Sequence, residues 1–142
     1  MIARFLMTAA LGLFSLSGCE SSRAPDAPPA PLDFDALAEF LLERLALQPG
    51  ERVLLVALPG SFDVLVSTFR EGVAATGATD LGAWSVAGDA PDAWATDFTA
   101  RLAAASDEVL VEILTEVDAA VMMPGATVTH PVYAALQDVL RQ

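Results

Sequence analysis

Residues 52–58 read Arg-Val-Leu-Leu-Val-Ala-Leu, an apolar run in which hydrophobic and polar residues do not alternate. A strand with one face in water shows such an alternation, whereas a strand that is buried on both faces does not. Strands of the second kind occur mainly in parallel sheets that carry helices on both sides. The run therefore predicts a central strand of a parallel sheet, and Pro59-Gly60 is expected to end it.

Two further apolar segments, residues 81–86 and 119–123, are predicted to be strands of the same sheet, although Gly82 weakens the first of them. Apolar residues recur at helical spacing before, between and after the strands, within 34–45, 62–73, 109–117 and 132–140. Residues 94–105 have a poor stripe but are also a candidate helix.

This alternation favours an α/β fold, a small three-stranded parallel sheet flanked by helices and joined by right-handed crossovers, as in a Rossmann- or flavodoxin-like lobe. The third strand is expected to be an edge strand of the sheet. Because doubly wound sheets usually have about five or six strands, residues 33–142 are expected to form an α/β domain that is one lobe of something larger.

Residues 1–18 are predicted to be a bacterial lipoprotein signal peptide. Arg4 is followed by an apolar region over 5–14, which is shorter than the roughly 20 residues of a membrane-spanning helix and is typical of a secretory signal. Leu16-Ser17-Gly18-Cys19 then resembles the lipobox, where the signal is cut before a cysteine that carries diacylglycerol. An ordinary signal peptide with an incidental cysteine is the alternative. The position of Cys19, and its being the only cysteine, favour lipidation.

Residues 19–32 are predicted to be the lipidated cysteine and a proline-rich linker. Four prolines in this segment favour polyproline II over any packed element. At about 3.1 Å per residue, residues 20–32 reach roughly 40 Å and form a semi-rigid spacer between membrane and domain. Glu20, in place of the Asp that retains enterobacterial lipoproteins at the inner membrane, favours the periplasmic side of the outer membrane.

Charge and composition exclude several classes of partner and site. Nineteen acidic against seven basic residues give a net charge of −12, so neither nucleic acid nor an anionic membrane surface is expected to bind by charge. A single cysteine and a single histidine exclude an internal disulfide and any metal site that needs two ligands of either type.

Ligands of open parallel sheets bind beyond the carboxyl ends of the strands. The polar residues that follow the three predicted strands form a possible ligand crevice, made of Ser61, Asp63, Asp89, Thr127, Thr129 and His130. Ser61 and His130 suggest a nucleophile and a base, but no acid is placed to orient the histidine. We therefore favour helix caps for both, since each directly precedes a predicted helix. An anion site at the helix that starts at Ser61 is a further alternative.

Glu108, Glu112 and Glu116 form an acidic row at four-residue spacing. A metal site requires ligands that converge in a shielded cavity, and a solvated helix face explains the row without that requirement. We therefore predict that this row holds no metal ion.

Residues 48–56, Gln-Pro-Gly-Glu-Arg-Val-Leu-Leu-Val, look at first like the opening of a class I methyltransferase. The strand of that fold continues into an acidic-Gly-x-Gly loop, whereas here it continues into Ala-Leu-Pro-Gly-Ser. The chain instead resembles the aminopeptidase T family of thermophilic metallo-aminopeptidases. The similar segments, within residues 36–142, are 48–56, Gly77-Ala78, Glu-Val-Asp-Ala-Ala-Val at 116–121 and Thr-His-Pro-Val-Tyr-Ala-Ala-Leu-Gln at 129–137.

The resemblance implies that residues 33–142 correspond to the N-terminal domain of that family, whose two-metal site belongs to a later domain. No catalytic residue or metal ligand carries over, so the chain is expected to hold no cofactor and to be non-catalytic by itself. We expect a lipid-anchored protein of the bacterial cell envelope, either a shortened gene product or a binding module. Alternatives are an enzyme lobe that pairs with a chain carrying the metal site, and a small-ligand-binding lipoprotein. A missing domain, self-association or a periplasmic partner would then cover apolar surface near the third strand and the last helix.

Overall fold

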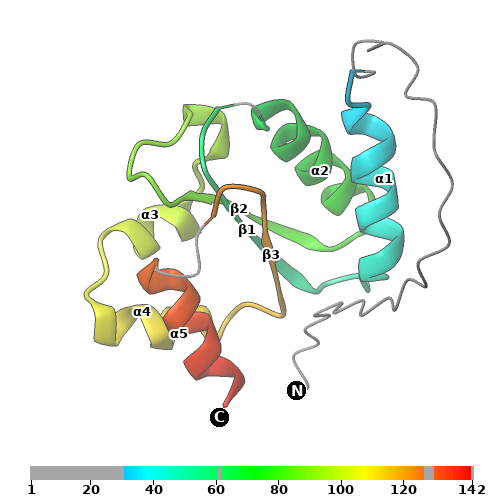
Figure 1. The fold of residues 1–142 in the computed structure, drawn as a ribbon. Helices are drawn as coiled ribbons and strands as arrows, with labels where there is room; N and C mark the ends of the chain where they lie inside the picture. Colours follow the sequence, from blue (N-terminus) through cyan, green and yellow to red (C-terminus); the bar gives the residue numbers. More distant parts are fainter. Residues whose placement is uncertain (1–30, 61, 127–129, 142) are drawn as a thin grey trace, which may run out of the picture.

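The computed structural model describes residues 31–60, 62–126 and 130–141, and Figure 1 shows their arrangement. Helices and strands alternate along this part of the chain, as the sequence predicts. The elements are α1 (Phe34–Leu45), β1 (Arg52–Ala57), α2 (Asp63–Ala75), β2 (Thr79–Ser85), the short 3-10 helix η1 (Asp92–Trp94), α3 (Asp97–Ala103), α4 (Asp107–Leu114), β3 (Ala119–Met122) and α5 (Pro131–Leu140).

The three strands form one parallel sheet in the order β2-β1-β3. β1 is central, and its residues Val53, Leu54, Leu55 and Val56 are each 0% exposed. Among the described residues β3 pairs with β1 alone, and all four residues of β3 are half-buried. The expected α/β fold, the parallel pairing and the edge position of the third strand are therefore confirmed.

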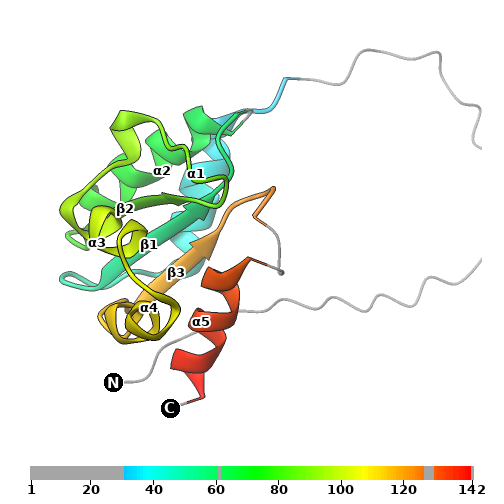
Figure 2. The same cartoon turned by 90° about the vertical axis from the view of Figure 1, so that its left-hand side faces the viewer.

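Helices cover both faces of the sheet, so the molecule has three layers. Alternate residues of β1 point to opposite faces: Val53 and Leu55 pack with α1 and α2, whereas Leu54 and Val56 pack with α3, α4 and α5. Figure 2 shows α1 and α2 on one side of the strands and α4 and α5 on the other. Two apolar cores on either side of one strand explain why its sequence lacks an alternating pattern.

Several predicted boundaries need correction. β1 and β3 each end one residue earlier than expected, before Leu58 and Met123, and β2 begins at Thr79 because its N–H donates to the Glu51 carbonyl oxygen at 2.7 Å. Residues 94–105 do not form one helix. Ala95 is extended and Thr96 starts α3 with a capping box, in which its hydroxyl accepts from the Thr99 N–H at 3.2 Å.

Gly82 lies at an irregularity in the pairing of β2 with β1. The register between β1 and β2 shifts between Val53 and Leu55, which marks a β-bulge, and Gly82 has a φ of +96° there. A Cβ at Gly82 would lie 2.8 Å from Oγ1 of Thr96. The carboxylate of Asp80 accepts from the Gly82 N–H at 2.9 Å and from Nε of Arg70 at 2.8 Å, so an ion pair stabilises the bulge.

Different contacts connect the helices and loops at the two ends of the strands. α1 and α2 both begin at the carboxyl end of the strands, where the rings of Phe34 and Phe62 meet at 6.2 Å. α1 is capped there as predicted, since Asp33 accepts from the Ala36 N–H at 3.0 Å. The other end of α1 leads to the amino end of the strands, where the Gly50 N–H donates to the Gly77 carbonyl oxygen at 2.9 Å. The segment before α1 therefore joins the domain at the carboxyl ends of the strands (Figure 1). We call this end of the sheet the carboxyl edge and the opposite end the amino edge.

Candidate functional site

His130 lies at the carboxyl edge as the N-cap of α5. Its Nδ1 accepts from the Val132 N–H at 3.2 Å, and Pro131 occupies the first helical position. An Nδ1 that accepts has no proton, so in the neutral ring the proton is on Nε2. The predicted capping role of His130 is confirmed, and the lone pair on Nδ1 is not free to act as a base.

The indole of Trp84 provides the wall against which His130 packs. The two rings meet edge to face, with centroids 5.9 Å apart and planes at 90°. Trp84 is in β2, aligned with Val56 of β1 and, beyond it, Met122 of β3. His130 follows β3, so this contact joins the ends of both edge strands across β1. The sequence carries no local pattern that pairs Trp84 with His130.

Asp89 lies in the exposed turn after β2. The hydroxyl of Ser85, which is almost fully buried, donates to the Asp89 carbonyl oxygen at 2.8 Å and accepts from the Ala87 N–H at 3.1 Å. These bonds hold the turn through its backbone. The Asp89 residue itself remains exposed at the same edge as His130, as the crevice prediction requires.

The start of α2 differs from the prediction. The N-cap is Phe62 rather than Ser61, because α2 begins at Asp63. The Asp63 carboxylate accepts from the Gly60 N–H at 2.8 Å, so the chain supplies its own anion at this helix N-terminus. This carboxylate disfavours the anion site considered there. Ser61 itself lies outside the described residues, as do Thr127, Thr129 and Cys19.

The amino edge carries a charged cluster that sequence patterns do not predict. Glu116 accepts from Arg52 at 2.8 Å and also pairs with Arg101, and both guanidinium groups lie over the Phe98 ring, at 5.7 and 5.6 Å from its centroid. The hydrogen bond from Arg101, followed by that from Arg52, lowers the pKa of Glu116 to about 2. Glu116 is therefore a structural ion-pair residue beyond the end of α4, and the expectation of a solvated row holds only for Glu108 and Glu112, which are exposed.

The large apolar side chains that are most exposed belong to segments other than β3 and α5. They are Leu32, Phe40, Leu58, Val64 and Val109. Val121 and Met122 of β3 are half-buried, and so are Val139 and Leu140 of α5. The apolar surface expected at these two elements thus consists of partly covered side chains.

Across 31–60, 62–126 and 130–141, no three or more His, Cys, Asp or Glu side chains gather as a set able to hold a metal ion. In the same part of the chain, no helix combines the length and the apolar character needed to cross a bilayer.

Comparison with known proteins finds no match for the chain. No family model matches it. No curated protein matches it, and neither does any solved structure.

Proposed function

We propose that the chain is a lipoprotein of the bacterial cell envelope, in which a lipid on Cys19 anchors a small α/β binding domain. The observation that carries this proposal is the Leu-Ser-Gly-Cys sequence at 16–19, which follows a short apolar region and precedes a proline-rich linker. The folded domain begins with the capped helix α1, immediately after that linker. Stable anchoring requires more than one acyl chain, which the triacylated cysteine of lipoproteins supplies.

The domain is proposed to bind rather than to catalyse. It resembles the N-terminal domain of aminopeptidase T-like enzymes, and the carboxyl edge with His130, Trp84 and Asp89 is the proposed place for a small ligand or a partner protein. The hydrogen bond at Nδ1 supports a structural role for His130. Because α1 starts at the same edge, the linker would hold this edge on the side of the anchor.

Lipid labelling in cells tests the proposal. Bacteria that express the chain are grown with labelled palmitate, and the protein is compared between membrane and soluble fractions. The wild-type chain is expected to carry label and to be found with the membrane. The Cys19→Ser variant is expected to lose the label and the processing, whereas Ser21→Ala, a matched change in the linker, keeps both.

Label on Cys19→Ser equal to that on the wild-type chain would contradict the proposal. So would a wild-type chain without label. Sucrose-gradient separation of the two membranes then tests the sorting suggested by Glu20, for which the outer membrane is the expected fraction.

A further inference from the structure

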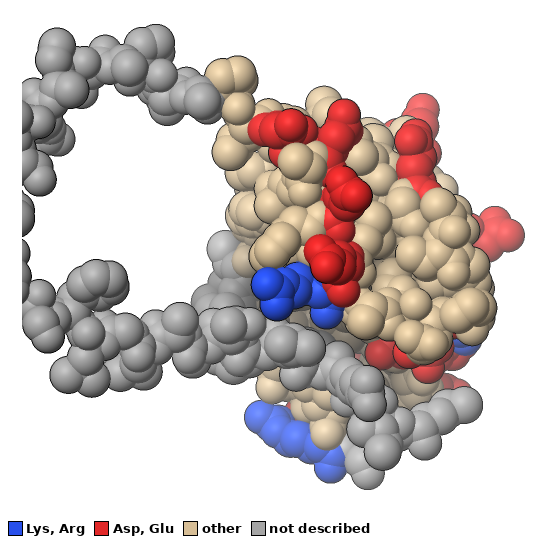
Figure 3. Space-filling view, turned by 90° about the vertical axis from the view of Figure 1, so that its right-hand side faces the viewer, with Lys and Arg blue, Asp and Glu red and all other residues tan. Residues whose placement is uncertain are grey.

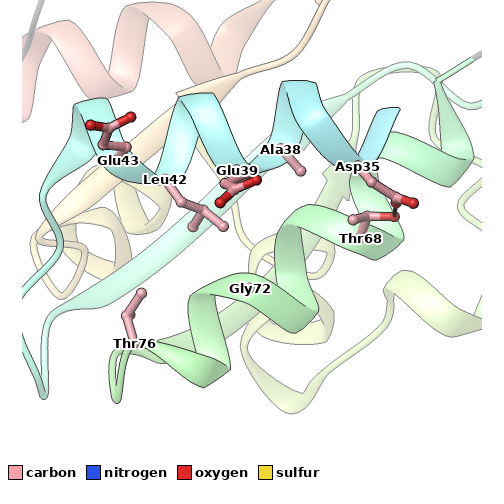
Figure 4. A pocket seen from close by; sticks show the side chains of 8 residues that line it. All are labelled: Asp35, Ala38, Glu39, Leu42, Glu43, Thr68, Gly72 and Thr76. Carbon is pink, nitrogen blue, oxygen red and sulfur yellow. Dashed lines mark hydrogen bonds between the residues drawn. The ribbon is translucent and has the colours of Figure 1, made fainter. Parts of the chain in front are cut away.

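A groove of about 390 Å³ runs between α1 and α2 on the outer side of these helices (Figure 4). Its apolar floor is made by Ala38, Leu42 and Gly72. The Leu42 side chain points toward α2, and its terminal methyl occupies the space that a Cβ at Gly72 would take. Thr68 of α2 and Thr76, the C-cap of that helix, line the groove as well.

Three carboxylates of α1 border this groove: Asp35, Glu39 and Glu43, at four-residue spacing. All three residues are exposed, and Figure 3 shows acidic side chains gathered on the face that carries α1. Like charges at this spacing destabilise a helix by a few tenths of a kcal/mol per pair. The row therefore costs the isolated domain stability.

No arginine within the described residues forms a salt bridge with this row. Arg44, on the same helix, lies over the Phe40 ring at 5.1 Å from its centroid. The other described arginines pair elsewhere: Arg52 and Arg101 with Glu116, Arg70 with Asp80, and Arg141 with Asp138. The hydroxyl of Thr68 donates to Asp35 at 3.3 Å, which adds no positive charge.

From these observations we infer that the groove is a docking site for a basic, amphipathic segment of a partner protein. Lysine or arginine side chains at four-residue spacing would face Asp35, Glu39 and Glu43, and an apolar side chain between them would cover Leu42. Charge complementarity selects this occupant. With a net charge of −12, a second copy of the chain, a nucleic acid and an anionic lipid surface would each be repelled. The inference does not depend on lipidation at Cys19.

A binding assay with a defined probe tests the inference. The full chain, in an uncharged detergent at low salt, is titrated into a dye-labelled helical peptide that carries lysine at every fourth position beside a stripe of leucine. Fluorescence anisotropy is expected to show saturable binding. Glu39→Gln/Glu43→Gln is expected to weaken the binding about fivefold, the loss of two surface charge contacts.

The matched control is Glu108→Gln/Glu112→Gln on α4, which removes two exposed acids at the same spacing away from the groove. This variant is expected to bind like the wild type, and a peptide with serine in place of leucine is expected to bind more weakly. Equal weakening by the two variants, equal binding of the serine peptide, or no binding at all would overturn the inference. Self-association of the chain that Glu39→Gln/Glu43→Gln abolishes would also overturn it, because the occupant would then be a second copy.

Discussion

The amino and carboxyl edges of the sheet are built from different interactions. At the amino edge, Arg52, Arg101 and Glu116 close over Phe98, and the Asp118 carboxylate accepts from the Arg52 N–H at 2.9 Å. At the carboxyl edge, the strands end in short turns, and the main side-chain contact between their ends joins His130 to Trp84. Polar groups at the first edge satisfy one another, whereas at the second edge Asp89 remains exposed.

This difference suggests a structural role for the amino edge and a functional role for the carboxyl edge. Charged groups that pair within the chain hold one end of the sheet, and that end has little to offer a ligand. The other end carries the exposed polar turns, the starts of α2 and α5, and the point where the linker joins α1. Parallel sheets bind ligands at this second edge, so the start of α1 and the proposed crevice lie at the same edge of the domain.

The largest loss of stability is expected from a substitution in β1, the central strand, which runs from the amino edge to the carboxyl edge. Leu55 of β1 is 0% exposed, and Leu55→Asp would bury a charge without a partner. We expect the loss of several kcal/mol of stability and therefore an unfolded or partly folded chain, measured by circular dichroism and urea unfolding. Val64→Asp is the control, because Val64 is 59% exposed in the first turn of α2. A cooperative, native-like transition for Leu55→Asp would contradict the buried position of β1.

A smaller effect is expected at the carboxyl edge. His130→Ala removes the cap of α5 and the contact with Trp84, and it should lower the free energy of unfolding by about 1–2 kcal/mol. His130→Asn restores an N-cap without the aromatic contact and should recover part of the loss. Urea unfolding followed by tryptophan fluorescence measures both. If alanine and asparagine unfold like the wild type, His130 does not stabilise this edge.

The smallest effect concerns the amino edge and depends on pH. The pKa of Glu116 in the folded chain, about 2, lies below its ordinary value of 4.5. Ionised Glu116 therefore stabilises the fold above the ordinary value, and this contribution is lost as pH falls toward 2. Because the side chain is 32% exposed, Glu116→Gln should cost less than about 1 kcal/mol near neutral pH.

Urea unfolding of Glu116→Gln and the wild-type chain, repeated between about pH 7 and pH 2, measures this difference. The two curves are expected to converge in acid. Glu112→Gln, on the exposed face of α4, should change stability by less than about 0.5 kcal/mol. A gap between wild type and Glu116→Gln that stays constant, or widens in acid, would show that the ion pair does not hold the amino edge.

Local signals in the sequence predicted much of the fold. The apolar run at 52–58 located β1, and the caps Asp33 and His130 act through their own neighbouring amides. The predicted boundaries are wrong where contacts with residues far away in the sequence determine the limits of a strand or helix. Bonds from Thr79 to Glu51 and from the Thr96 hydroxyl to the Leu81 carbonyl oxygen set the limits of β2 and α3, and no local pattern shows them.

The candidate site was less predictable than the fold for the same reason. Placement at the carboxyl edge follows from parallel topology, and Asp89 and His130 are there. Three features involve segments that are separated in the sequence. They are the contact of His130 with Trp84, the pairing of Glu116 with two arginines, and the groove between α1 and α2. Small residues at Ala38 and Gly72 are the one sequence signal that points to close approach of those helices.

The mass of the peptide that contains Cys19 tests the central proposal most directly. Trypsin cleaves after Arg4 and Arg23, so the processed lipoprotein should yield residues 19–23, Cys-Glu-Ser-Ser-Arg, as its N-terminal peptide. Mass spectrometry of protein extracted from membranes is expected to find this peptide with diacylglycerol on the thiol and, in the triacylated form, an acyl group on the amine. An unmodified peptide that spans residues 5–23 would show that the signal is retained and Cys19 free, and it would contradict the proposal of a lipid-anchored domain.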